Sequence, residues 1–120
     1  MKYMLLLYAA PDKEPAYGTP EFDDMMEAFA ATSDTFKNDG VLVGGEGLQD
    51  VETATSLRIK AGKVEIMDGP FAETREHLGG YYVVDVADLD TALKYAEMIP
   101  IAHFGTVEIR PLLDYDPADG

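Results

Sequence analysis

The chain has no cysteine, and it has few basic residues: nine Lys and Arg against 23 Asp and Glu in 120 residues. Without cysteine there is no disulfide framework, no thiolate zinc site and no cysteine nucleophile. A chain of this kind is typical of a reducing compartment, and we expect a cytoplasmic protein.

The shortage of bases gives the chain a net charge of −14. Such a polyanion repels nucleic-acid phosphates and anionic lipid, so we expect no nucleic-acid partner and no membrane partner. The excess acid instead keeps the protein soluble. No stretch approaches the roughly 20 apolar residues of a membrane span.

The N-terminal run superficially resembles a signal peptide, since Met1-Lys2 precedes the apolar segment YMLLLYAA. The segment is short, contains two tyrosines and meets Pro11-Asp12 without a small-x-small cleavage pattern. It therefore predicts a first strand.

Hydrophobic residues make up 47% of the chain and only seven residues are proline, which indicates a folded domain. We expect one domain over residues 1–120, large enough to bury a core without disulfides or metal. Residues 114–120 read as a loose acidic tail.

Two predicted strands are apolar on both faces. The first runs from Lys2 to Ala9, and the second from Tyr81 to Val86 is interrupted only by Asp85. An exposed face would alternate with polar residues, so both strands are predicted to be central and covered on both sides.

Two helices are predicted between strands. The first begins with Thr19 as the N-cap and Pro20 in the first turn, and it stops at Gly40, a residue suited to a left-handed C-cap. Its stripe is predicted to pack in the core: Phe22, Met25, Met26, Phe29, Ser33 and Phe36. The second helix begins after Asp88 and ends at Pro100.

The remaining strands are predicted at residues 41–44, 53–60, 63–67 and 105–113, with Ala61-Gly62 as the turn of a hairpin. The order is β-α-β, a hairpin, then β-α-β. This predicts an α+β fold, a ferredoxin-like sandwich with a mainly antiparallel sheet and two helices on one face.

Two helices cover only one face of that sheet. Because both central strands are apolar on both faces, the second face needs another cover, and a second copy of the same sheet provides it. We therefore expect an obligate homodimer.

Several blocks resemble the YCII-related family, specifically its DGPF-domain branch. They occur in order along nearly the whole chain: MKYMLLLY at 1–8, GGEGL at 44–48, DGPFAETREHLGGYYVVDV at 68–86, LDTAL at 89–93 and GTVEIRP at 105–111. The resemblance implies a dimeric α/β-barrel, similar in fold to muconolactone isomerases, small monooxygenases and haem enzymes that use a cleft on the sheet. It also implies a link to sigma factors of the extracytoplasmic-function type, and a catalytic His–Asp pair.

The catalytic candidates lie in the charged, turn-rich segment 67–86, where a small scaffold commonly carries its function. His77 titrates near neutral pH and, beside Asp68 or Glu73, could act as a general acid or base. The alternatives are structural: Asp68 as a turn former, His77 as a solvated loop residue and Glu73 as a surface ion-pair partner.

The ligand-binding candidates are Arg75 and Arg110, which could hold a carboxylate through a bidentate fork, together with Glu46 and Tyr81. Glu46 lies in a glycine cluster that could expose its carboxylate in a cleft, or that could be an ordinary turn or bulge. In so acidic a chain, each arginine also finds internal carboxylate partners easily.

We expect no metal, because His77 and His103 have no metal-ligand spacing, and no cofactor. Three functions remain open. The chain could be a cofactor-free acid–base enzyme acting on an unknown small, partly apolar molecule. It could be a non-catalytic sensor or regulator linked to a sigma factor, or a dimeric domain whose loop serves assembly alone.

Overall fold

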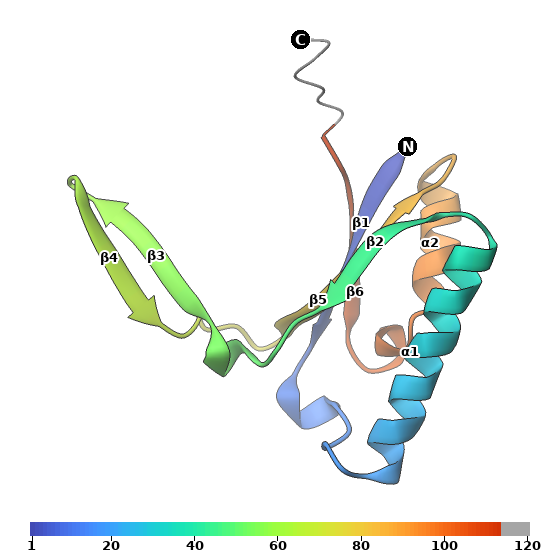
Figure 1. Cartoon of the computed structure of the whole chain (residues 1–120), viewed down its shortest axis with the longest axis horizontal. Helices are drawn as coiled ribbons and strands as arrows, with labels where there is room; N and C mark the ends of the chain where they lie inside the picture. Colours follow the sequence, from blue (N-terminus) through green and yellow to red (C-terminus); the bar gives the residue numbers. More distant parts are fainter. Residues whose placement is uncertain (114–120) are drawn as a thin grey trace.

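The computed structural model describes residues 1–113, whose main sheet has four strands. Figure 1 shows α1 and α2 on the same side of this sheet. The sheet has the order β2-β5-β1-β6, and every neighbouring pair is antiparallel. Its strands are β1 (Lys2–Ala9), β2 (Leu42–Gly47), β5 (His77–Asp85) and β6 (Thr106–Pro111). The predicted tail, 114–120, lies outside the described residues.

The helices are α1 (Pro20–Asn38) and α2 (Leu89–Glu97), and they connect β1 to β2 and β5 to β6. This connectivity and strand order are those of a ferredoxin-like α+β sandwich, as the sequence pattern predicts. Three short 3₁₀ turns complete the chain: η1 (Pro11–Lys13), η2 (Val51–Thr53) and η3 (Pro100–His103). Within residues 1–113, no helix is both long and apolar enough to cross a membrane.

Both helices begin at the predicted capping residues. The hydroxyl of Thr19 accepts a hydrogen bond from the Phe22 amide at 3.2 Å, and the Asp88 carboxylate accepts one from the Thr91 amide at 2.9 Å. These bonds satisfy amides that have no partner within the helix. Gly40, with φ +73°, takes the left-handed conformation expected after α1.

The core lies between the sheet and the helices. Alternate residues of β1 are buried there, namely Tyr3, Leu5, Leu7 and Ala9. Phe36 of α1 is fully buried and packs edge-on against Tyr82 and Tyr95, with ring centroids 5.2 Å apart in both pairs. Ser33 and Tyr82 share a hydrogen bond of 3.0 Å, which ties α1 to β5.

The opposite face of the sheet carries apolar side chains that no helix covers. Met4, Leu6 and Tyr8 of β1 are only half-buried, although β1 is a central strand. The strand register places Met4 opposite Val83 and Leu6 opposite Tyr81, so the uncovered side chains adjoin one another. We call this surface, Met4, Leu6, Tyr8, Tyr81 and Val83, the open sheet face. The predicted two-sided apolar pattern is therefore present.

Two strands are longer than predicted. β5 begins at His77 rather than at Tyr81, because His77 and Leu78 already pair with Ala9 and Tyr8. The register shifts between Leu7 and Tyr8 and leaves Gly79 without a partner, which is a bulge that hides the strand pattern in sequence. β2 extends to Gly47, so Glu46 lies in a strand and not in a turn.

Strands β3 (Thr55–Lys60) and β4 (Lys63–Asp68) form a separate hairpin, which we call the β3–β4 arm. Its turn residues have positive φ angles, 52° at Ala61 and 79° at Gly62, as a two-residue hairpin turn requires. Figure 1 shows the arm projecting on the side of the sheet away from α1 and α2. The predicted hairpin is therefore confirmed, but it stands apart from the main sheet.

The paired glycines of β2 provide a test of this packing. A Cβ on Gly45 would lie 2.7 Å from the Tyr81 carbonyl oxygen of β5, whereas a Cβ on Gly44 meets nothing within 4 Å. We expect Gly45→Ala to lower the free energy of unfolding by about 1–3 kcal/mol, since the clash is with backbone. Gly44→Ala is the control and should change it by less than about 1 kcal/mol. Urea unfolding of both variants measures this; equal effects would contradict the strand pairing.

Candidate functional site

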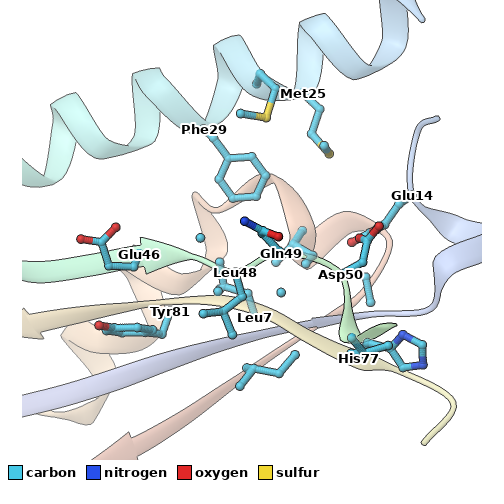
Figure 2. Close-up of a pocket in the computed structure, with 18 of the residues that line it drawn as sticks. Leu7, Glu14, Met25, Phe29, Glu46, Leu48, Gln49, Asp50, His77 and Tyr81 are labelled. Carbon is cyan, nitrogen blue, oxygen red and sulfur yellow. The ribbon is translucent and has the colours of Figure 1, made fainter. Parts of the chain in front are cut away.

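A cleft of about 740 Å³ lies between the N-terminal half of α1 and the sheet. Phe22, Met25 and Phe29 of α1 form one wall, and Leu7 of β1 lies across from them. Figure 2 shows Met25 and Phe29 above the sheet and Leu7 within it.

The cleft exists because the sheet presents little side-chain volume at this level. On the helix side of the sheet, the row that contains Leu7 continues through Gly80 to Gly47. Glycines leave space that larger residues would fill. The hollow therefore lies over glycines of the GGEGL and LGGYY segments. A Cβ on Gly47 would meet nothing within 4 Å, whereas one on Gly80 would meet the β2 backbone.

The stripe on α1 that was predicted to be core is core only at its C-terminal end. Phe36 is fully buried and Phe29 packs against the core, but Phe22 and Met25 are only partly buried and Met26 is 50% exposed. The prediction was wrong for the first two turns because helical spacing does not reveal whether the facing strands fill the space. These side chains line the cleft instead.

One end of the cleft is acidic. Figure 2 shows Glu14 and Asp50 close together, with His77 beside them. Glu14 follows η1, whose turn is closed by a hydrogen bond from the Lys13 amide to the Ala10 carbonyl. Asp50 precedes η2, and His77 is the first residue of β5. Three separate segments thus contribute to this end.

The electrostatics at this end favour a neutral or cationic guest. Partial burial raises the pKa of the Glu14 carboxyl above its ordinary value; the nearby Asp50 charge raises it further, and His77 opposes the shift. Another carboxylate, Glu52, borders the cleft. Among the described residues, no Lys or Arg lines it, so no cation is in place to hold an anionic group.

The structure brings some of the predicted site residues together and leaves others apart. His77, Glu46 and Tyr81 border the cleft. Tyr81 lies on the side of β5 away from α1 (Figure 2), and its cross-strand partner is Glu46, so by register both side chains belong to the open sheet face.

Glu73 borders a second hollow of about 640 Å³, which it shares with His77, Pro70 and Phe71. His77 thus stands between the two hollows. In the part of the chain that the structure describes, no side-chain hydrogen bond fixes its ring.

Asp68, Arg75 and Arg110 border neither hollow. Arg110 lies on the exposed surface of β6, with its Nε 3.9 Å from a Glu108 carboxylate oxygen. Asp68 is exposed at the end of β4, opposite Thr55. The adjoining turn is held by other groups: the Gly69 amide donates to the Ala54 carbonyl at 2.7 Å, and the Ser56 hydroxyl donates to the Gly69 carbonyl at 2.8 Å.

Sequence reasoning missed Glu14 and Asp50. Glu14 lies in a loop rich in proline and Asp50 in a short connection with a second acid, Glu52, and nothing in either pattern separates them from surface carboxylates. One available signal was position, since the Glu14 loop follows directly from the central strand β1. Within residues 1–113, the His, Asp and Glu side chains form no group of three that could hold a metal ion.

Comparison with known proteins identifies the same family that the sequence blocks resemble, the YCII-related family. A family model described as the YCII-related domain matches residues 1–116. A protein of Rhizobium meliloti (strain 1021), named only as uncharacterised, is 36% identical over 121 aligned residues. The alignment covers 99% of this chain and 98% of that protein, so the likeness extends over the whole fold.

Substitution of Glu14 tests the electrostatics of the acidic end. Because folding raises the pKa of its carboxyl, the folded state binds the proton more tightly than the unfolded state does. At pH values above the raised pKa, the charged carboxylate therefore lowers the free energy of unfolding. This destabilisation disappears as the pH falls below 4.5, the ordinary pKa of the group. We expect Glu14→Gln to raise the melting temperature at pH 7, with a difference that shrinks toward pH 4.

The control is Asp34→Asn, which removes an exposed carboxylate from α1. Thermal melts of both variants between pH 4 and 8 make the measurement. A Glu14→Gln variant that melts below the wild-type protein at pH 7 would show that the charged carboxylate is stabilised at this site.

Proposed function

The chain belongs to the YCII-related family, and from this premise and the cleft beneath α1 we propose that it is a homodimer that binds a small, partly apolar molecule. The observation that carries the proposal is the cleft itself: apolar side chains from α1 on one wall and carboxylates at one end, with His77 beside them. Clefts that are mostly apolar, with a few convergent polar groups, are the usual form of small-molecule sites.

The guest is neutral or positively charged. An anionic guest would meet Glu14, Asp50 and Glu52 without a compensating cation, at a cost in desolvation and repulsion. An amine or a hydroxyl at that end would instead donate hydrogen bonds to carboxylate oxygens. The aromatic and thioether side chains of α1 suit an apolar body.

Acid–base chemistry on such a guest requires only protein side chains that can accept and donate a proton. His77 supplies an imidazole and Glu14 a carboxyl, and partial burial raises the pKa of that carboxyl above its ordinary value. Groups shifted in this way, within a cleft, are candidates for proton transfer. Of the catalytic candidates Asp68, Glu73 and His77, only His77 borders this cleft, while Glu73 borders the neighbouring hollow.

The segment Asp68–Phe71, which reads DGPF, supports membership of the DGPF-domain branch. A sensor that works with an extracytoplasmic-function sigma factor is the second candidate. It is favoured by the lack of a described hydrogen bond on the His77 ring, since a sensor needs a binding cleft but not an oriented base. Turnover of a bound guest would separate the enzyme from the sensor.

Three matched probes test the charge preference: 2-phenylethylamine, 2-phenylethanol and phenylacetate, which share a ring and differ in charge. We expect the amine and the alcohol to bind in the cleft and the carboxylate to bind at least about tenfold more weakly. Asp50→Asn should weaken the amine and leave the alcohol unchanged, whereas Phe29→Ala should weaken both. Calorimetric titration measures each constant.

Asp90→Asn, at an exposed position on α2, is the matched control and should change none of these constants. Phenylacetate that binds as tightly as the amine would contradict the proposed charge preference. Equal binding to the wild-type protein and Phe29→Ala would place the guest elsewhere.

The open sheet face supports the homodimer. Met4, Leu6, Tyr8, Tyr81 and Val83 form one apolar surface that no helix covers, and a second copy packed face to face would bury it.

Leu6→Lys tests this contact, because Leu6 lies at the centre of the open sheet face on a central strand. We expect the dimer dissociation constant to rise by about tenfold or more while the protomer stays folded. Leu93→Lys, on an exposed position of α2, is the control for the same substitution. Sedimentation equilibrium reads the constants; a wild-type protein that stays monomeric at all concentrations would contradict the homodimer.

A further inference from the structure

The β3–β4 arm is amphipathic. Its strand register pairs Leu57 with Ile66 and Ile59 with Val64, so these four apolar side chains share one face. The other face pairs Arg58 with Glu65 and Lys60 with Lys63. A strand pair that sorts its residues in this way has one face made for burial.

That apolar face is uncovered in the single chain. Leu57, Ile59, Val64 and Ile66 are 62%, 66%, 58% and 65% exposed, respectively. An isolated two-stranded hairpin is at best marginally stable in water, so the arm needs a surface to pack against. Its own domain does not supply one, since the arm projects away from the sheet and the helices (Figure 1).

The dimensions of the molecule lead to the same conclusion. Its radius of gyration is 16.7 Å and its extents are 49 × 48 × 18 Å. A compact domain of this length has a radius of gyration of about 14 Å. The larger radius of gyration reflects the projecting β3–β4 arm. The apolar side chains of this arm are not part of the core cluster of their own chain.

The charge of the arm indicates the partner. Residues 55–68 carry three bases, Arg58, Lys60 and Lys63, against two acids, Glu65 and Asp68. The whole chain holds nine bases and 23 acids, so the remainder holds six bases and 21 acids. The arm therefore carries a small net positive charge on a strongly anionic body, and the body of a second copy is complementary to it.

The apolar area of the β3–β4 arm is too small to form a stable interface by itself. Four half-exposed aliphatic side chains present on the order of 300 Å² of apolar surface. A stable specific interface buries about 800 Å² on each partner. The arm alone is too small, but Figure 1 places it on the same side of the molecule as the open sheet face.

We propose that the β3–β4 arm is an exchange arm, which seats its apolar face on the body of a second copy of this chain while the two open sheet faces pack together. Two-fold symmetry then gives two arms, each of which holds the other protomer. The cationic tip at Lys60 and Lys63 lies against acidic surface of the partner. This inference rests on the homodimer proposed above, and adds to it a contact that the sheet face does not make.

Hydrogen exchange of the arm amides in the wild-type dimer is the direct test. We expect slow exchange at concentrations where the dimer dominates, and fast exchange on dilution below its dissociation constant. Leu57→Lys/Ile66→Lys should weaken the dimer by about tenfold or more and should give fast exchange in the arm at any concentration. Arg58→Lys/Glu65→Lys places lysines at the neighbouring pair on the opposite face and should leave the arm protected.

A charge-reversal variant tests the electrostatic contribution of the arm to dimer stability. Lys60→Glu/Lys63→Glu should weaken the dimer by several-fold at low salt, and the difference should narrow at 1 M salt, where surface charges are screened.

The outcomes separate the two proposals. Fast exchange in the arms of a wild-type dimer would overturn the exchange arm and leave the sheet-to-sheet homodimer intact. Arm amides that stay protected in the diluted monomer would also overturn it, because the arm would then pack on its own chain. A wild-type protein that never dimerises would overturn both.

Discussion

The central strand β1 imposes the constraint on which the rest of the structure depends, because it is apolar on both faces. Alternate residues, Leu5 and Leu7 among them, are buried under the helices, while Met4, Leu6 and Tyr8 lie on the other face. An antiparallel sheet can leave one face in water only when that face is polar. The two helices satisfy one side, and the proposed homodimer satisfies the other. The sheet thus separates the side that carries the proposed binding cleft from the side that carries the proposed dimer contact.

On the side that faces the helices, the cleft depends on the small side-chain volume of the sheet. On the surface that faces α1, Gly80 lies beside Leu7 and Gly47 lies beside Gly80, so the first turns of the helix lie over open space. Loops that follow β1 and β2 then bring Glu14 and Asp50 to one end of that space. An apolar wall and an acidic end select an apolar guest with a hydrogen-bond donor or a positive charge.

Much of this fold follows from local chemistry, and much of the site does not. Thr19 and Asp88 mark the helix starts, and Ala61-Gly62 marks the hairpin turn, because caps and turns are decided by neighbouring residues. Family resemblance and the two-sided strands also point to the right architecture. The cleft could not be predicted, because it depends on the volume of strands far away in sequence. Asp68, Arg75 and Arg110 illustrate the converse: charged residues of suggestive type border neither hollow.

The methyl NMR spectrum of the six methionines tests directly whether the cleft and the open sheet face are separate sites. Met25 and Met26 line the cleft, and Met4 lies on the open sheet face. We predict that 2-phenylethylamine shifts the Met25 and Met26 signals and leaves the Met4 signal in place, while dilution shifts the Met4 signal and leaves the other two. A Met4 signal that shifts with the amine, or that stays unchanged on dilution while the Met25 and Met26 signals shift, would contradict this division of the molecule.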